Sequence, residues 1–139
     1  MLLRRQIVNG YRDLVVWQQA MDLVVDAYRI TKRFLPEEKC GLVQQLRRAA
    51  VLVPSNIAEG HGRDHLGDYV RLLSIANGSL MELETQVLIA GRMGYVSKDD
   101  EGNVLARAAT VGRLLAGLTR ALKGRHRDPP DTRHLTPDT

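Results

Sequence analysis

Histidine, glutamate and cysteine are the residue types in this 139-residue chain that could support catalysis or bind a metal. Its four histidines are His61, His65, His126 and His134, which fall at an expected helix end, in a loop and in a C-terminal tail. None has a partner in a metal-ligand pattern, and the Glu-x-x-His repeat of di-iron helical bundles is absent. We therefore expect no metal, no cofactor and no catalytic residue, so that the protein is not an enzyme.

The other candidates have structural explanations. Glu59, together with Asn56, is predicted to anchor a bent helix, and Glu82 and Glu84 are predicted to pair with arginines on other helices. Cys40 is the single cysteine, which excludes an internal disulfide, and we expect it to be a small packed residue rather than a nucleophile. No glycine motif of the P-loop or dinucleotide-binding type occurs.

Basic residues form the more informative pattern. No acidic residue occurs between Val104 and Arg127, and Arg113 and Arg120 stand seven residues apart on one side of the predicted helix. Such a face could bind phosphates with release of counterions, or its arginines could flank a helix interface and stabilise the C-terminal end of the helix dipole. Arg47 and Arg48, together with Arg63, form a second basic cluster around the predicted kinked helix. The candidate nucleic-acid-binding residues are Arg47, Arg48, Arg63, Arg107, Arg113, Arg120, Lys123, Arg125 and Arg127.

Composition favours a helical domain. Apolar residues make up 44% of the chain but aromatic residues only 4%, so a core of leucine, valine, isoleucine and alanine is expected, which suits helix-on-helix packing. The net charge of +4 fits either a polyanionic partner or a solvated basic surface. No apolar run approaches the roughly 18 residues of a membrane span, and a signal-peptide stretch is missing. We expect one domain in the cytoplasm, with no membrane contact.

The first helix is predicted from Asp13, as N-cap, to Leu35, just before Pro36. Its apolar residues form two stripes, although a single stripe is enough for one core. The second stripe is expected to face either a wide core or a neighbouring subunit. The first stripe is Val16, Ala20, Leu23, Ala27, Ile30 and Phe34, and the second is Leu14, Trp17, Met21, Val24 and Tyr28.

The second helix contains Pro54, which removes one hydrogen bond and costs about 3 kcal/mol inside a helix. Apolar residues keep helical spacing across it, from Leu42 to Ile57, which predicts a helix that is bent rather than ended. We expect Ser55 and Asn56 to satisfy the carbonyls that the proline frees, and Gly60 and Gly62 to end the helix. The structural motif therefore comprises Pro54, Ser55, Asn56, Glu59 and Gly60.

Two further helices complete the prediction. One occupies 66–93 with Gly94 as its C-terminal cap, and the other runs from the N-cap Ser97 to near Gly124. The expected fold is an all-α, up-and-down four-helix bundle with a proline-kinked second helix. Residues 1–12 form an N-terminal arm, 13–123 the bundle, and 124–139 a disordered, basic, proline-rich tail.

Three stretches, "DLVVWQQAMDL", "EKCGLVQQLRRAAVLVPSNIAEGHGR" and "GSLMELETQVLIAGRMGY", closely resemble the four-helix-bundle proteins encoded in intervening sequences of bacterial 23S ribosomal RNA genes. The run around "PSNIAEG" is the most specific part. The resemblance implies a bundle that assembles into a ring-like homopentamer. A distant relative is the accessory variability protein of diversity-generating retroelements, which works with a reverse transcriptase and RNA. The chain departs from the family pattern at Cys40 and Leu52, which affects local packing.

Two functions follow from these observations. The first is a non-catalytic, oligomeric RNA-binding protein whose arginines contact the phosphate backbone with little sequence readout. The second is a pentameric protein-interaction scaffold, such as an accessory subunit of a reverse transcriptase, which contacts nucleic acid only incidentally. The low aromatic content counts against base stacking as a mode of RNA recognition.

Overall fold

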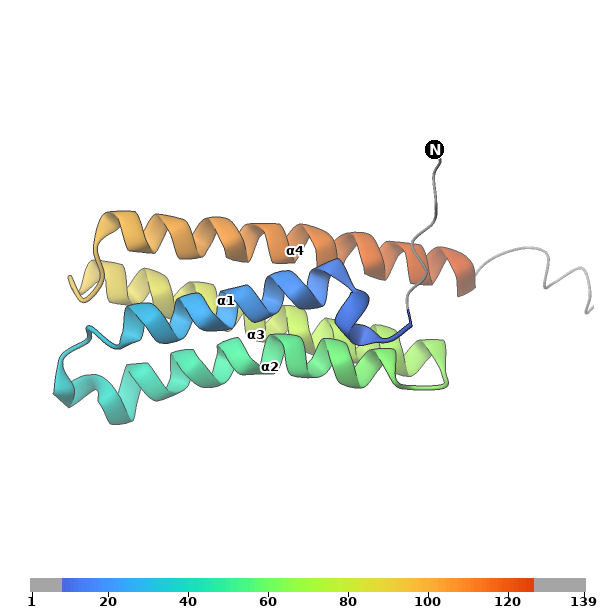
Figure 1. Ribbon diagram of the computed structural model, residues 1–139, viewed down its shortest axis with the longest axis horizontal. Helices are drawn as coiled ribbons and strands as arrows, with labels where there is room; N and C mark the ends of the chain where they lie inside the picture. Colours follow the sequence, from blue (N-terminus) through green and yellow to red (C-terminus); the bar gives the residue numbers. More distant parts are fainter. Residues whose placement is uncertain (1–8, 127–139) are drawn as a thin grey trace, which may run out of the picture.

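A computed structural model describes residues 9–126, which form α-helices and short helical turns and no β-strand. Successive helices run in opposite directions, and each packs against two neighbours, α1 and α3 both lying beside α2 and α4 (Figure 1). The predicted all-α, up-and-down four-helix architecture is confirmed. The four helices are α1 (Val15–Thr31), α2 (Gln44–His61), α3 (Leu66–Arg92) and α4 (Lys98–His126), and the short turns are Tyr11–Asp13, Pro36–Glu38 and Lys39–Val43.

The core consists of one apolar stripe from each helix. Every residue of the first predicted stripe of α1 is buried, which confirms that this stripe faces the core. Leu80 and Leu83 of α3 belong to the same buried cluster as Val111 and Leu115 of α4. Small and branched residues fill this core almost alone, with Phe34 as its buried aromatic residue in the described part of the chain.

The start of α1 differs from the prediction. Asp13 is not the N-cap, because it ends a separate 3-10 turn in which the Leu14 N–H donates to the Tyr11 carbonyl at 3.0 Å. Leu14 itself has an extended backbone and precedes the first helical residue. The Asp13 carboxylate instead accepts a hydrogen bond from the Asn9 backbone N–H at 2.9 Å, so it stabilises the turn and not the helix.

The end of α1 also comes earlier than expected, at Thr31 rather than at Leu35. Beyond Thr31 the backbone bonds change to the tighter three-residue spacing, and the Phe34 N–H donates to the Thr31 carbonyl at 3.2 Å. The Thr31 hydroxyl donates to the Ala27 carbonyl at 2.7 Å. This tightened turn still directs Phe34 into the core, which explains why the apolar spacing continued past the true helix end.

The second helix continues through Pro54, as predicted, because α2 spans Gln44–His61 without interruption. Pro54 is buried, whereas Ser55 is exposed. The side-chain amide of Asn56 donates to the Leu52 carbonyl at 2.8 Å. The carbonyl that lacks its helical donor because of Pro54 belongs to Ala50, so the expected role of Asn56 at the freed carbonyl is wrong.

Gly60 lies inside the last turn of α2 and does not end the helix, which continues to His61. Its importance is steric. A Cβ at this position would lie 2.9 Å from the Tyr69 ring and 3.2 Å from Leu72 Cβ, so only glycine lets α2 and α3 meet so closely near their connection. Residues 62–65 then connect α2 to α3.

The predicted boundaries between α3 and α4 are confirmed. Gly94 adopts φ of +76°, and the Tyr95 N–H donates to the Ala90 carbonyl at 2.9 Å, which is the pattern of a Schellman cap. Ser97 caps α4, since its hydroxyl accepts the Asp100 backbone N–H at 3.1 Å. At its other end α4 passes Gly124 and reaches His126.

Several predicted features fall outside this description. Residues 1–8 of the predicted arm and 127–139 of the predicted tail are not among the described residues, and Arg127 and His134 go with them. The side chain of Cys40 is likewise outside the description. Residues 11–13 form a helical turn, and residues 124–126 belong to α4.

Candidate nucleic-acid interface

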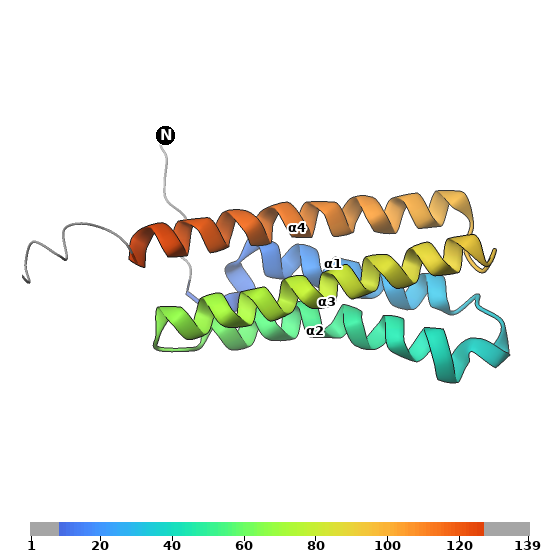
Figure 2. The ribbon, with the colours of Figure 1, turned by 180° about the vertical axis from the view of Figure 1, so that it is seen from behind.

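A groove between α3 and α4 carries two of the predicted cations, Arg120 and Lys123. We call it the α3–α4 groove. These helices lie side by side over much of their length (Figure 2). The groove has a volume of about 340 Å³, an apolar floor and a rim of hydroxyl, amide and basic side chains. Its lining residues are Val70, Leu73, Ser74 and Asn77 of α3 and Leu115, Ala116, Thr119, Arg120 and Lys123 of α4.

The basic residues in the C-terminal half of α4 are exposed and lack acidic partners. Arg113, Arg120, Lys123 and Arg125 all reach solvent, and none of them takes part in an ion pair within residues 9–126. Arg113 donates only to the Thr110 hydroxyl on its own helix, at 3.2 Å. All four therefore keep their positive charge available to an external anion. Helical geometry places Arg113, Arg120 and Lys123 on one side of α4, and we call these three residues the α4 cationic face, whereas Arg125 lies on the other side of the helix.

Arg125 is close enough to Tyr69 to influence its ionisation. Burial raises the pKa of the Tyr69 phenol above its ordinary value of 10, and the positive charge of Arg125 offsets part of that rise. The Tyr69 ring also meets His61 edge to face, with 5.8 Å between ring centroids. The phenol is consequently neutral at physiological pH, so it does not neutralise the cations at this end of the bundle.

Arg107 is different, because α1 supplies it with acidic partners. Its Nε lies 2.6 Å from an Asp26 carboxylate oxygen, and its Nη1 lies 3.6 Å from Asp22 and 3.3 Å from the Gln19 amide oxygen. The Asp26 side chain is only 17% exposed. Arg107 is thus part of the α1–α4 packing, and we remove it from the candidate phosphate contacts.

Of the second predicted cluster, two arginines are engaged. Arg47 donates from Nε to the Thr31 hydroxyl at 2.8 Å and places its guanidinium carbon 4.5 Å from the centre of the Tyr28 ring. Arg63 pairs with Glu59 at 2.6 Å, so Glu59 forms a surface ion pair with a residue just beyond α2. Arg48 is exposed and makes no ion pair in the described part of the chain.

Two other predictions about acidic residues fail. Glu82 is exposed and Glu84 is half-buried, and within residues 9–126 neither forms the expected ion pair with an arginine of another helix. The inter-helix ion pairs instead use Asp22 and Asp26, and Asp100 of α4 binds Arg33, just beyond α1, at 3.0 Å. The sequence pattern shows which residues share one face of a helix, but it does not show which faces of different helices pack together.

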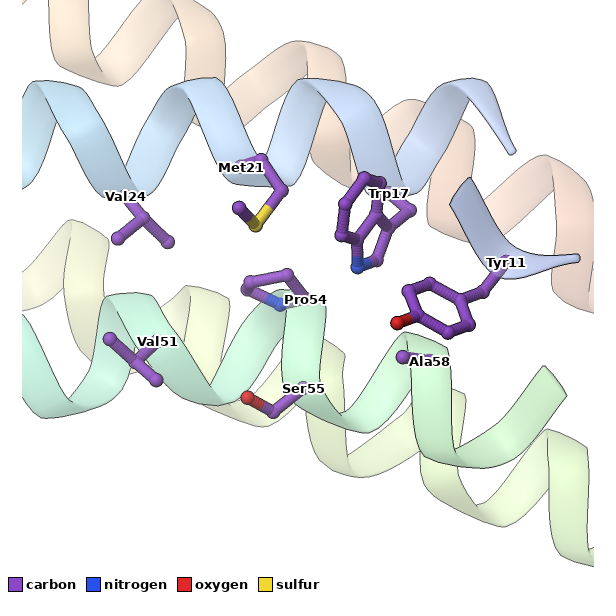
Figure 3. A pocket seen from close by; sticks show the side chains of 8 residues that line it. All are labelled: Tyr11, Trp17, Met21, Val24, Val51, Pro54, Ser55 and Ala58. Carbon is purple, nitrogen blue, oxygen red and sulfur yellow. The ribbon is translucent and has the colours of Figure 1, made fainter. Parts of the chain in front are cut away.

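A second groove, between α1 and α2, is apolar, and we call it the α1–α2 groove. Trp17, Met21 and Val24 of the second stripe of α1 line one side, and Val51, Pro54, Ser55 and Ala58 of α2 line the other (Figure 3). Tyr11 closes one end and packs edge to face on Trp17, with 5.2 Å between ring centroids. The second stripe is therefore only partly covered, since Met21 is 40% exposed and Tyr28 is 39% exposed.

No group of three or more histidine, cysteine, aspartate or glutamate side chains in residues 9–126 is arranged to hold a metal ion. None of the described helices is long and apolar enough to cross a membrane.

Fold and surface together define a small antiparallel four-helix-bundle protein with one cationic groove and one apolar groove. The chain belongs to the 23S rRNA-intervening sequence protein family, whose model matches residues 12–117. This match confirms the family resemblance drawn from the sequence.

A solved structure supports the same architecture. The chain is similar to a crystal structure from Bacteroides thetaiotaomicron VPI-5482, described as a protein of unknown function from the S23 ribosomal protein family. The TM-score is 0.71 at 20% sequence identity, and the alignment covers 76% of this chain and 98% of that one. At this identity the likeness establishes the fold alone. No curated protein matches the chain.

Proposed function

We propose that this protein is a non-catalytic, oligomeric nucleic-acid-binding protein of the cytoplasm, and that the α4 cationic face binds RNA phosphates. The proposal depends on one observation. Four basic side chains stand exposed on an acid-free stretch of helix, and none has an ion-pair partner among the described residues, whereas Arg107 on the same helix is neutralised by α1.

The chemistry of the α3–α4 groove suits a phosphate chain. Arg120 and Lys123 at its rim supply charge, and Ser74, Asn77 and Thr119 supply hydroxyl and amide donors for phosphate oxygens. No aromatic residue lines the groove, so it lacks a platform for base stacking. The proposed binding is therefore directed to the backbone, with little discrimination between sequences.

Assembly would strengthen such binding. The partly covered second stripe of α1 supports a homo-oligomer, and the family resemblance favours a ring, with a pentamer as the proposed state. In a ring, several cationic faces engage one RNA, so each further contact forms at a raised effective concentration.

The test replaces Arg113, Arg120 and Lys123 with glutamine and measures binding to a structured RNA over a range of salt concentrations. We expect affinity to fall at least about tenfold, and the slope of log affinity against log salt to flatten by roughly 0.7 to 0.9 for each lost phosphate contact. The fold is expected to persist, because the three side chains are exposed and form no inter-helix hydrogen bond or ion pair in the described residues.

The matched control replaces with glutamine three other exposed cations that form no ion pair in the described residues, namely Lys32, just after α1, and Arg71 and Arg92 on α3. Equal losses of affinity in control and test variants would reject the α4 cationic face as a specific site. Loss in the test variant alone supports it.

A second candidate function is a scaffold for a partner protein such as a reverse transcriptase. The observation in its favour is the apolar α1–α2 groove, which resembles surfaces that receive a helix. The ratio of absorbance at 260 and 280 nm in freshly purified protein, before and after a high-salt wash, separates the two functions. Nucleic acid that salt removes favours RNA binding, and protein free of nucleic acid from the start favours the scaffold.

A further inference from the structure

The bundle leaves two unlike apolar surfaces uncovered. One is the α1–α2 groove. The other lies on α3 and consists of side chains between 42% and 47% exposed, which interrupt an otherwise polar helix surface. We call this second surface the α3 outer face. It comprises Ile75, Met81, Leu88 and Ile89, with Glu82 among them.

The α1–α2 groove is longer than its first cavity. A second cavity of about 460 Å³ continues it along α2 and shares Val51 with the first. Tyr28 and Gln44 line this second part, and Arg47 and Arg48 form its basic edge. The apolar floor therefore extends from Ala58 at one end to Gln44 at the other, while the positive charge gathers toward the Gln44 end.

Both surfaces occupy the same levels along the bundle. The antiparallel helices α2 and α3 meet where Gly60 faces Leu72. Val51 lies nine residues before Gly60, and Met81 lies nine residues after Leu72, so these two side chains are level. By the same count Ile89 is level with residue 43, beside Gln44, and Ile75 is level with residue 57, beside Ala58.

The two surfaces also carry opposite charges at similar levels along the bundle axis. Glu82 is exposed and forms no ion pair within residues 9–126, and the same holds for Arg48. Counted from the Gly60 contact, Glu82 is level with residue 50, which is two residues or about 3 Å from the level of Arg48. An acidic residue within one apolar surface thus stands opposite the basic edge of the other.

We propose that the α3 outer face of one copy of this chain packs into the α1–α2 groove of the next, with Glu82 pairing with Arg48 across the contact. This inference rests on the proposed oligomer and specifies its interface. The contact joins unlike surfaces, so a pair of copies keeps one free surface of each kind for further neighbours. Rotation about an axis parallel to the helices preserves the level of every residue, which is the condition that the two surfaces meet.

The positions of the two surfaces favour a closed ring over a straight filament. The surface diametrically opposite the α1–α2 groove is the α3–α4 groove, because each helix packs against two neighbours in a square. The α3 outer face lies to one side of that diameter. Each added copy is therefore turned relative to the last, and a turn about one axis that divides the full circle closes a ring. The contact leaves the outer surface of α4 uncovered.

Two variants disable one surface each. Met21→Lys with Val51→Lys places charge in the groove, and Ile75→Lys with Ile89→Lys places charge on the α3 outer face. All four side chains are substantially exposed, so the bundle itself tolerates the changes. We expect each variant to be monomeric by light scattering at micromolar concentration, with the helical circular dichroism of the parent. Ala109→Lys with Ala121→Lys, both exposed on α4, is the matched control and stays oligomeric.

Mixing the two variants gives the decisive measurement. One intact groove and one intact α3 outer face remain between them, so an equimolar mixture should form a 1:1 heterodimer and stop there. A parent chain that is monomeric overturns the proposed oligomer itself. A parent oligomer whose variants both stay oligomeric, or whose monomeric variants do not combine, overturns this interface and leaves the oligomer standing.

Charge exchange provides an independent check. Arg48→Glu and Glu82→Arg are each expected to weaken assembly, and the chain that carries both changes should recover it, since the pair is restored with reversed sign. Recovery supports the proposed pairing. A double variant weaker than both single variants overturns it.

Discussion

Two grooves of this bundle are built alike but differ in which side chains they leave exposed and unpaired. Each lies between neighbouring antiparallel helices, but the α1–α2 groove holds Arg47 against Tyr28 and Thr31 and exposes apolar side chains. The α3–α4 groove covers its apolar floor and leaves Arg120 and Lys123 without ion-pair partners in the described residues. A cation's neighbours on other helices, and not its own helix, therefore decide whether it is free to bind.

If the grooves divide assembly from RNA binding, disabling assembly should affect long and short RNAs differently. We expect Met21→Lys with Val51→Lys to lower affinity for a long structured RNA about 100-fold, because multivalent contact is lost. Affinity for an RNA that fills one α4 cationic face should stay within about twofold. Filter binding with the two lengths measures both, and equal losses would show that the grooves do not act separately.

Removal of the ion-paired cation Arg107 should lower the stability of the fold and leave RNA binding unchanged. Arg107→Met leaves Asp26, which is 17% exposed, without its closest partner. Because the Arg107 side chain is itself 35% exposed, we expect a loss of only about 1 kcal/mol in unfolding free energy, or a few degrees in Tm. RNA affinity measured on the same preparation should not change. A variant that binds RNA more weakly at unchanged Tm would return Arg107 to the interface.

The floor of the α1–α2 groove offers a milder test of assembly. Pro54→Ala restores a backbone donor to the Ala50 carbonyl and removes the proline ring from the groove floor. We expect the dissociation constant of the oligomer to rise about fivefold, which corresponds to roughly 1 kcal/mol of lost apolar contact, with little change in helix content. Sedimentation and circular dichroism follow the two quantities. An oligomer of unchanged strength would show that the proline is dispensable for assembly.

The smallest effect is expected when an acidic residue is introduced beside the α4 cationic face. Ala116 is exposed in the α3–α4 groove and lies four residues before Arg120. Ala116→Glu should pair with Arg120, raise stability by no more than about 0.5 kcal/mol and weaken RNA binding several-fold. Ala116→Gln is the neutral control. Equal binding by the glutamate and glutamine variants would contradict the phosphate-binding role.

The sequence predicted elements well and contacts between elements poorly. Apolar spacing placed the core stripe of α1 and the passage of α2 through Pro54, because burial on one face of a helix imposes a period that can be read directly. It could not place Asp13, whose carboxylate stabilises a 3-10 turn held by backbone bonds that no side-chain pattern records.

For the candidate site, the acid-free stretch of α4 led to Arg113 and Arg120 but also to Arg107. These three residues look alike in sequence, since neutralisation of Arg107 comes from Asp22 and Asp26, some 80 residues away in the chain. The polar donors of α3, Ser74 and Asn77, were missed for the same reason. What marks these two residues is their position beside α4 in the groove, and that position is known only once the fold is known.

The unequal lengths of the helices have a consequence for amide hydrogen exchange. α4 contains 29 residues and α1 only 17, so α4 extends beyond the start of α1 by up to about 18 Å, and its last turns lie at the end of the bundle (Figure 1). After Leu122, the last buried residue of the described chain, few contacts oppose local opening, and amide protons there should exchange faster than those near Val111. An RNA held by Arg120 and Lys123 would slow that exchange, so the end of α4 reports occupancy of the groove without any substitution.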